Sequence, residues 1–383
     1  MLDHIHIIFV TWLITYTSAL QWKQLASSDL ANGPVGRTSP SNVMYRDSLV
    51  MYGGANHCGN FRPTYNDTWL FNLTTLQWTR LLTINDPPLG RWGHFAWIDP
   101  LFDSDSMLIF GGRHGEKYDL QAPFSDVWRL NLKTFIWSKL NDGIPGKTIM
   151  VGNNGAIATP EGKIFFLNSN RATSNVSAAT EIWLYDVHTN TFTSVPILSS
   201  FVPKQEWLFS VVALNWVKKS NNHRILDNLK SLVVYGGWEQ NQFYRFNVQT
   251  GKFINLTSIG PKPPDSAGHV AISARTATEE SVYMMWSAKN QPELWFYSYA
   301  EHTWSSMNLS SPAPSPRLYT QIVPISNSGA ISLLTPIICL IIVINDGLCP
   351  GRVDGDTTSL CFINCAGDDW NNMIENSTKQ KQK

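Results

Sequence analysis

The chain has 383 residues, of which 43% are apolar and 15% are charged, and its formal net charge is zero. This length and apolar content are enough for one large β domain or two ordinary domains. A neutral chain gives no electrostatic support to a nucleic-acid partner or to an acidic membrane surface, so we expect neither.

The N-terminus carries a short apolar run from Ile7 to Tyr16, and the small residues Ser18 and Ala19 follow it. This arrangement is typical of a secretory signal peptide, although His4 and His6 stand where Lys or Arg is usual. A buried strand or an uncleaved anchor also fits the pattern. We expect residues 1–19 to be a signal peptide, which predicts a secreted, extracellular protein.

Secretion would make the Asn-x-Ser/Thr triplets of the chain usable as glycosylation sites. The triplets begin at Asn66, Asn72, Asn175, Asn255, Asn308 and Asn376. Their number is close to what chance gives for this composition. They therefore follow from secretion and do not establish it.

Pairs of aromatic residues nine positions apart recur roughly every 60 residues along the chain. The pairs are Trp69/Trp78, Trp128/Trp137, Trp183/Phe192, Tyr244/Phe253, Trp295/Trp304 and, more weakly, Cys361/Trp370. Self-similarity at such a period indicates an array of equivalent supersecondary units. The repeat therefore predicts the fold before any single segment does.

The best-defined unit, residues 89–140, contains four β-prone segments separated by Gly, Pro, Asn and Asp. Its second segment, Met107–Phe110, is apolar at consecutive positions and ends at Gly111 and Gly112. Such a strand is typical of a sheet that is covered on both faces. We expect four-stranded sheets that are stable only when stacked around an axis, with the third-strand Trp filling the wedge between neighbouring sheets.

An apolar strand that ends in a diglycine, followed by Asp-x-Trp and a second aromatic residue, resembles the kelch motif. The resemblance covers about residues 21–374. It implies an all-β, kelch-type β-propeller, in the group that includes galactose oxidase, muskelin and attractin-like proteins. We expect six four-stranded blades in residues 20–374 and a polar C-terminal tail at 375–383. A seven-bladed ring of which this chain is an incomplete part stays an alternative.

The segment Gln21–Leu25 is similar to the fourth-strand segments around Trp78 and Trp137. Propellers of this family often join an N-terminal strand to the last blade, so this segment is expected to close the ring. The apolar run 330–344 is too short for a typical membrane helix and contains Pro336. It is interpreted as a core strand of the sixth blade, with a membrane anchor as the alternative.

The five cysteines suggest two disulfides and one thiol in an oxidising compartment. In the propeller that the resemblance implies, Cys58 and Cys349 lie in the second-to-third strand loops of adjacent first and sixth blades. A Cys58–Cys349 disulfide at the ring closure is therefore a hypothesis. Cys361 and Cys365 are a second candidate pair, and Cys339 is expected to be an inert thiol.

The resemblance to galactose oxidase raises a copper enzyme as one hypothesis. The copper site of that family needs an adjacent Tyr-His pair, which this chain lacks. His94 and His269 share a first-strand position and either line the central channel or are repeat residues satisfied by the backbone. Asp67 and Asp126 are expected to cap turns, and Asp105 to be solvated in a hairpin loop. We expect no metal, no cofactor and no catalytic residue.

The leading hypothesis is a secreted, non-catalytic scaffold that binds a protein or a glycan through loops between the second and third strands. The alternatives are a galactose-oxidase-like copper enzyme and the propeller fragment of a larger attractin-like receptor. The loops are 55–65, 113–124 and 170–179. The side chains most suited to contact a ligand are His57, Phe61, Arg62, Arg113, His114, Glu116 and Lys117.

Overall fold

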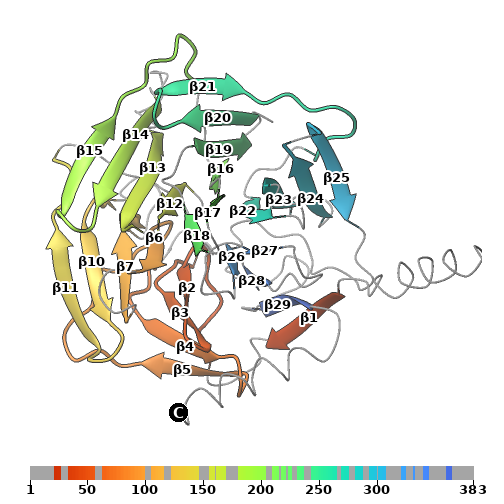
Figure 1. Cartoon of the computed structure of the whole chain (residues 1–383). Helices are drawn as coiled ribbons and strands as arrows, with labels where there is room; N and C mark the ends of the chain where they lie inside the picture. The colour runs from red at the N-terminus through yellow and green to blue at the C-terminus, as the bar shows by residue number, and fades with distance from the viewer. Residues whose placement is uncertain are drawn as a thin grey trace, which may run out of the picture.

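Figure 1 shows the computed structural model of the chain. The described residues are 21–26, 33–56, 63–99, 105–115, 122–145, 155–159, 161–169, 180–203, 209–214, 217–220, 223–226, 231–236, 243–264, 269–275, 281–287, 293–299, 301–307, 321–324, 331–332, 340–344 and 359–364. Every regular element in these ranges is a β-strand. The predicted all-β class is therefore confirmed.

The strands form antiparallel four-stranded sheets, which we number as blades in chain order. Blade 1 consists of β2 (Ser41–Tyr45), β3 (Ser48–Tyr52), β4 (Thr68–Asn72) and β5 (Gln77–Leu81). Blade 2 consists of β6 (Phe95–Ile98), β7 (Ser106–Phe110), β10 (Val127–Asn131) and β11 (Ile136–Asn141). Blade 3 consists of β12 (Ala156–Ala158), β13 (Lys163–Ser169), β14 (Thr180–Asp186) and β15 (Thr191–Val195).

The later blades repeat this order with small additions. Blade 4 consists of β16 (Phe209–Leu214), β19 (Ser231–Gly236), β20 (Phe243–Asn247) and β21 (Lys252–Asn255). Blade 5 consists of β22 (Val270–Arg275), β23 (Ser281–Ser287), β24 (Glu293–Ser298) and β25 (Thr303–Met307), and β27 (Ile331–Ser332) adds to it in parallel with β22. Blade 6 consists of β26 (Gln321–Pro324), β28 (Leu340–Ile344), β29 (Ser359–Asn364) and β1 (Gln21–Ala26).

Two short hairpins are inserted between the strands of these blades. The pair β8 (Arg113–His114) and β9 (Ala122–Pro123) lies between the second and third strands of blade 2. The pair β17 (Val217–Ser220) and β18 (His223–Leu226) lies between the first two strands of blade 4.

The blades stand around a common centre, with the first strand of each innermost (Figure 1). In the ring, β2 contacts β6 and β26, β16 contacts β12 and β22, and β22 also contacts β26. The N-terminal strand β1 pairs with β29 and so becomes the outermost strand of blade 6. This is the closure that the sequence predicted, and the described strands account for six blades.

The apolar run 330–344 supplies the second strand of blade 6 through β28, as expected for a strand. Its residues 330 and 333–339 lie outside the described ranges. Within the described part of the chain, no helix has the length and apolarity needed to cross a membrane.

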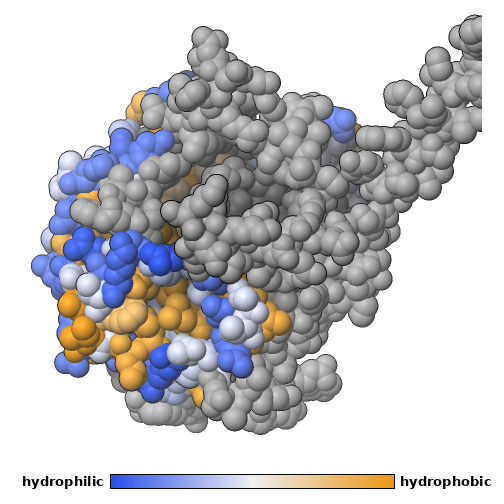
Figure 2. All heavy atoms as spheres, turned by 60° about the horizontal axis from the view of Figure 1, so that its bottom comes forward, coloured by the Kyte–Doolittle hydropathy of each residue, from blue (hydrophilic) through white to orange (hydrophobic). Residues whose placement is uncertain are grey.

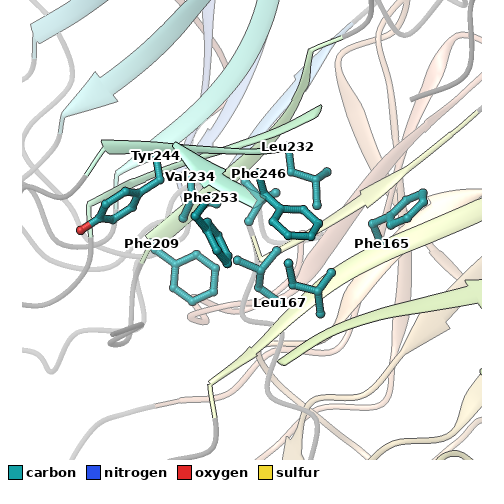
Figure 3. Close-up of a cluster of buried hydrophobic side chains, with 10 residues drawn as sticks. Phe165, Leu167, Phe209, Leu232, Val234, Tyr244, Phe246 and Phe253 are labelled. Atoms are coloured by element: carbon teal, nitrogen blue, oxygen red, sulfur yellow. The ribbon is translucent and has the colours of Figure 1, made fainter. Parts of the chain in front are cut away.

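The core lies in the wedges between neighbouring blades, because the second strands of blades 1, 2 and 4 are buried on both faces. The five residues of β7 are all buried, and the six residues of β19 are too. One apolar cluster joins blades 2 and 3, and another joins blades 3 and 4 (Figure 3). Neither face of a blade could be left in water, so stacking around the ring is what stabilises the sheets.

The repeated Trp residues fill the wedge only in part in the first three blades, where Trp128 and Trp183 pack against the apolar clusters. Trp69, Trp128 and Trp183 are only half-buried. The wedge is filled by the residue two positions later, which in blades 1 to 5 is at most 1% exposed: Phe71, Leu130, Tyr185, Phe246 and Tyr297. The fourth-strand aromatic residue lies directly opposite it, as in the Phe71–Trp78 and Phe246–Phe253 pairs. The buried cross-strand pair is therefore formed by the residue two positions after the conspicuous third-strand aromatic residue, together with the fourth-strand aromatic residue.

The turn between the third and fourth strands is built in the same way in several blades. Asn72, Asn131 and Asn247 each accept two backbone N–H groups from the turn through the side-chain Oδ1 atom. The turn ends in a left-handed residue, such as Phe135 with φ 57° in blade 2. These Asx turns, and not Asp67 or Asp126, carry the turn capping that the sequence suggested.

Asp105 is buried rather than solvated, which corrects the sequence-based expectation. It precedes β7 in blade 2, and its side chain is 10% exposed. In blade 1, Tyr45 at the end of β2 and Arg46 in the β2–β3 turn donate hydrogen bonds to its Oδ1 atom at 2.6 and 2.9 Å. Lys133 forms an ion pair with the other carboxylate oxygen. The carboxylate therefore ties blade 2 to blade 1.

The Asp105 cluster predicts a stability difference that depends on pH. The hydrogen bond from Lys133, followed by that from Tyr45, lowers the pKa of Asp105 from 3.8 to about 2. A carboxyl whose pKa is lower in the folded state stabilises the fold above its unfolded pKa, and that contribution is lost as the pH falls towards the folded pKa. Urea titrations should therefore show Asp105→Asn less stable than the wild type at pH 7, with the gap closing between about pH 4 and pH 2.

Asp142 offers a matched control, because its side chain is 91% exposed and, among the described residues, forms an ion pair with Lys139 alone. Asp142→Asn should show no comparable pH-dependent gap. An Asp105→Asn gap that stays constant from pH 7 to pH 2 would contradict the assignment of the effect to the carboxylate charge.

Candidate binding face

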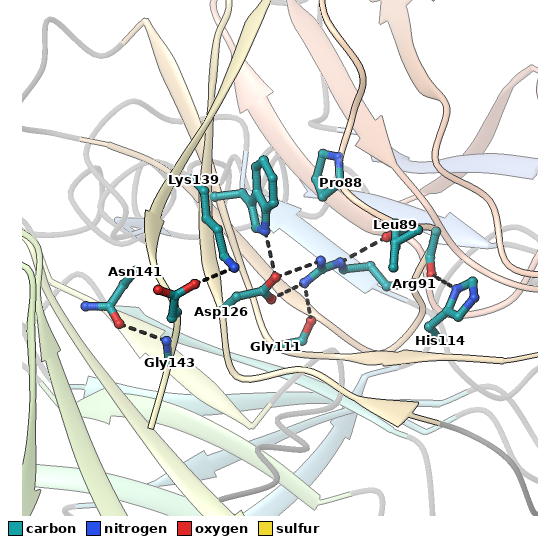
Figure 4. A network of polar contacts seen from close by, with 12 residues as sticks. Pro88, Leu89, Arg91, Gly111, His114, Asp126, Lys139, Asn141 and Gly143 are labelled. Carbon is teal, nitrogen blue, oxygen red and sulfur yellow. Dashed lines mark hydrogen bonds and ion pairs between the residues drawn. The ribbon is translucent and has the colours of Figure 1, made fainter. Parts of the chain in front are cut away.

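The loops between second and third strands rest on two buried arginines, one in each of the first two blades. Arg37 precedes β2 and Arg91 precedes β6, and they are 0% and 1% exposed. The Arg91 guanidinium donates to both carboxylate oxygens of Asp126 at 2.6 and 3.2 Å (Figure 4). It also donates to the Gly111 carbonyl at 3.0 Å. A bidentate ion pair of this kind fixes the relative orientation of the two side chains and also brings their opposite charges together.

Arg37 repeats this arrangement in blade 1. It donates to Asp67 through both terminal nitrogens and to the Gly53 carbonyl at 3.0 Å. Burial pushes the pKa of Asp67 upward, but the hydrogen bonds and charge of Arg37 outweigh it and hold that pKa below its ordinary value. Trp69 donates its indole N–H to Asp67, and Trp128 donates to Asp126, both at 2.7 Å. The Asp-x-Trp sequence is thus the acceptor half of an arginine clamp.

The diglycines are required because neighbouring segments of the chain approach their backbone closely. Gly53 has φ 69°, and a Cβ atom there would lie 2.6 Å from the Arg91 carbonyl oxygen. Gly112 has φ 94°, and its Cβ would lie 2.9 Å from the Cβ of His94. Only glycine tolerates both this backbone conformation and this approach.

His94 and His269 do not line an open channel, because both side chains are completely buried. His269 shares a 2.7 Å hydrogen bond with the Ser210 hydroxyl, which lies in the preceding blade. His94 packs edge-on against Tyr52, as His269 does against Tyr235. Burial, followed by the charge of Arg91, lowers the pKa of His94 well below its ordinary value, so this ring is neutral. Both histidines belong to the packing between blades.

Arg113 and His114 form β8, which lies next to the Arg91 clamp. The backbone of Arg113 pairs with Trp92 through two hydrogen bonds of 3.0 Å. The His114 Nδ1 atom lies 2.7 Å from the Gly90 carbonyl oxygen and 3.0 Å from the Thr64 hydroxyl. Two loop residues of blade 2 therefore meet the loop of blade 1 and the linker between the two blades.

Apolar side chains are exposed beside the Arg37 and Arg91 clamps. Val35 and Leu89 stand two residues before Arg37 and Arg91 and are 58% and 61% exposed. Their carbonyls turn inward and accept hydrogen bonds from the arginine Nε atoms at 3.1 and 3.3 Å. Figure 2 shows apolar residues among hydrophilic ones over the lower part of Figure 1, where blade 1 lies. We call Val35, Thr64, Leu89, Arg113 and His114 the loop face.

The structure describes only part of the predicted site. Arg113 and His114 are in place, whereas His57, Phe61, Arg62, Glu116 and Lys117 lie outside the described residues. So do Cys58, Cys339, Cys349 and Cys365, and of Cys361 only the place on β29 is described. Asn66 and Asn255 are exposed, and Asn72 is the last residue of β4, where its side chain caps the following turn. Asn175, Asn308 and Asn376 also lie outside the described residues.

Sequence reasoning missed the arginines as partners of the repeated aspartates. The signal was present, because a Gly-Arg dipeptide opens the first two repeats at Arg37 and Arg91. Pairing each arginine with the Asp-x-Trp that follows 30 or 35 residues later needed the fold. No group of three or more His, Cys, Asp or Glu side chains suited to a metal occurs among the described residues.

Comparisons with known proteins agree with this architecture. Residues 8–220 match the family described as the KLHDC2/KLHL20/DRC7 Kelch-repeats domain. The fold is similar to that in "Structure of YjhT", with a TM-score of 0.53 over 89% of this chain and 98% of that one, at 13% sequence identity. The chain belongs to the kelch-repeat family, and it folds as a kelch-type β-propeller.

Individual relatives match shorter segments of the chain than the family does. Kelch repeat-containing protein 2 of Saccharomyces cerevisiae is 30% identical over 27% of this chain, which is 12% of that protein. Tip elongation aberrant protein 1 of Schizosaccharomyces pombe is 30% identical over 33% of the chain and 10% of that protein. The host cell factor homolog hcf-1 of Caenorhabditis elegans is 27% identical over 44% of the chain and 23% of that protein. The chain thus spans less than a quarter of each. Kelch propellers generally bind proteins.

Proposed function

We propose that this chain is a non-catalytic scaffold that binds a protein partner through the loop face. The observation that supports this most is the combination of a rigid base and exposed contacts. The Arg37 and Arg91 clamps fix the loops from below, and Val35 and Leu89 present apolar side chains beside the polar Arg113 and His114. A buried, ordered base limits the loss of entropy when a partner binds.

The loop positions named from the sequence fit the same proposal. His57, Phe61 and Arg62 belong to the loop that ends at Thr64, and Glu116 and Lys117 belong to the loop that leaves His114. They would extend the loop face with aromatic and charged side chains. Aromatic residues and arginine are enriched at the centres of protein interfaces.

Site-specific crosslinking tests the proposal. A photo-crosslinking amino acid at position 89 should capture a defined partner from cells that express the chain, whereas the same probe at position 259 should not. Ile259 is a matched control, because it is 67% exposed but lies in the linker before blade 5. Leu89→Asp should then abolish copurification of that partner, and Ile259→Asp should not. Equal capture from both positions, or stoichiometric copper in the purified protein, would contradict the proposal.

We also propose that the chain enters the secretory pathway, with residues 1–19 as its signal peptide, 20–374 as the propeller and 375–383 as a polar tail. The exposed side chains of Asn66 and Asn255 are compatible with glycans in that compartment. A secreted propeller could take a glycan as well as a protein as its ligand, and the Cys58–Cys349 and Cys361–Cys365 pairs would be oxidised there. Expression in cultured eukaryotic cells tests this, since full-length chain found only in the cytosol would contradict it.

A further inference from the structure

His114 occupies a defined place in the loop face. Its Nδ1 atom is 2.7 Å from the Gly90 carbonyl oxygen, which can only accept a hydrogen bond. The proton of the neutral imidazole must therefore be on Nδ1, and the Thr64 hydroxyl oxygen, 3.0 Å away, can share it as a second acceptor. It follows that Nε2 carries a lone pair.

The Nε2 edge of the ring makes no hydrogen bond with the part of the chain that the structure describes. The His114 side chain is half-buried, and within the described part of the chain its hydrogen bonds are made by Nδ1. In Figure 4 the His114 ring lies beside Leu89 and Arg91. Among the described residues, none forms a hydrogen bond with Nε2, so this acceptor is a candidate contact for a ligand.

The His114 ring is also held in position by Phe124, which itself packs against Arg91. It contacts Phe124 with a centroid distance of 6.2 Å, and the Arg91 guanidinium lies 4.1 Å from the centre of the Phe124 ring. Gly90 lies close to the backbone of the blade 1 loop, since a Cβ atom there would lie 2.6 Å from the Thr64 carbonyl oxygen. The clamp therefore orients the imidazole through two separate contacts, and an acceptor fixed in this way discriminates between ligands.

We propose that His114 determines specificity at the loop face: its Nε2 atom accepts a hydrogen bond from an N–H or O–H group of the bound polypeptide. The neighbouring Leu89 packs against an apolar side chain of the same segment. A carboxylate placed at Nε2 is disfavoured, because two acceptors would face each other there. This role rests on the proposed function, since it names what the loop face recognises.

The tautomer can be measured without any ligand. In ¹⁵N-histidine-labelled full-length protein at neutral pH, the His114 signals, assigned by their loss in His114→Asn, should show a protonated Nδ1 and an unprotonated Nε2. A protonated Nε2 with a bare Nδ1 would overturn the inference. This measurement holds whether or not the chain binds proteins.

The ligand preference is tested with a displayed library of random dodecapeptides, captured on the immobilised full-length protein. His114→Asn keeps an N–H donor near the Nδ1 position but removes the Nε2 acceptor. It should weaken the captured peptides about five- to tenfold, the worth of one hydrogen bond. Replacing the donor side chain of a captured peptide by methionine should weaken wild-type binding equally and His114→Asn binding very little.

His188→Asn is the matched control, because His188 is exposed in the β14–β15 turn of blade 3. It should leave peptide affinity unchanged. Peptides that bind wild type and His114→Asn equally would overturn the role of His114 while leaving the proposed function intact. A library that yields no peptide would contradict the proposed function and the ligand-selecting role together.

Discussion

Replacing Arg91 by methionine should lower the free energy of unfolding by about 3–5 kcal/mol, the usual cost of removing one partner from a buried ion pair. Methionine fills much of the same space but donates no hydrogen bond. Asp126 would lose both of its guanidinium bonds, and the carbonyls of Gly111 and Leu89 would lose theirs. Denaturation by urea, followed by tryptophan fluorescence, measures the loss.

Three further variants separate charge, geometry and packing in this clamp. Arg91→Lys keeps the charge but not the planar fork, so its loss should be intermediate. The double variant Arg91→Met/Asp126→Asn should be more stable than Arg91→Met alone, because no buried charge is left without a partner. Arg80→Met is the surface control, since Arg80 is exposed on β5, and its effect should stay within about 0.5 kcal/mol. If Arg91→Met were as stable as Arg80→Met, the clamp would not hold the loops.

The propeller could be predicted from the sequence because its signals are local and repeated. Each strand end is marked nearby, as Gly111 and Gly112 mark the end of β7, and the period carries the same pattern to the next blade. Even the closing strand β1 was predictable, since Gln21–Leu25 resembles the fourth strands that precede it in the ring. Fold class followed from these patterns without any knowledge of long-range contacts.

The site was harder to predict, because its contacts join residues distant in sequence. A buried Asp needs a cation, but which one depends on how β3 and β4 bring Asp67 back to Arg37. The burial of the repeated Trp was also misjudged for a physical reason. Trp69 and Trp128 use the indole N–H to bond Asp67 and Asp126, so they stay near the loop end of the strand and half in water. A fully apolar residue two positions on takes the wedge.

Phe166→Ala should destabilise the chain by about 3–5 kcal/mol, because it leaves a cavity in the wedge between blades 2 and 3. Phe166 lies on β13 and is completely buried. Its ring is 4.8 Å from that of Phe110 in blade 2 and 6.2 Å from that of Phe192 in its own blade. The cavity would thus remove contacts across the blade boundary, and urea denaturation again measures the loss.

Phe201→Ala provides the comparison of equal size, since that ring is 48% exposed and should cost about 1 kcal/mol or less. Equal losses from the two variants would contradict the view that the wedges hold the ring together. The Phe166 and Arg91 variants also act on different contacts. Phe166 joins two blades, whereas Arg91 and Asp126 lie in one. Because stacking of blades is what makes each sheet stable, Phe166→Ala should also weaken the cooperativity of unfolding. Arg91→Met should lower the stability without this loss of cooperativity, and it should also loosen the loop face.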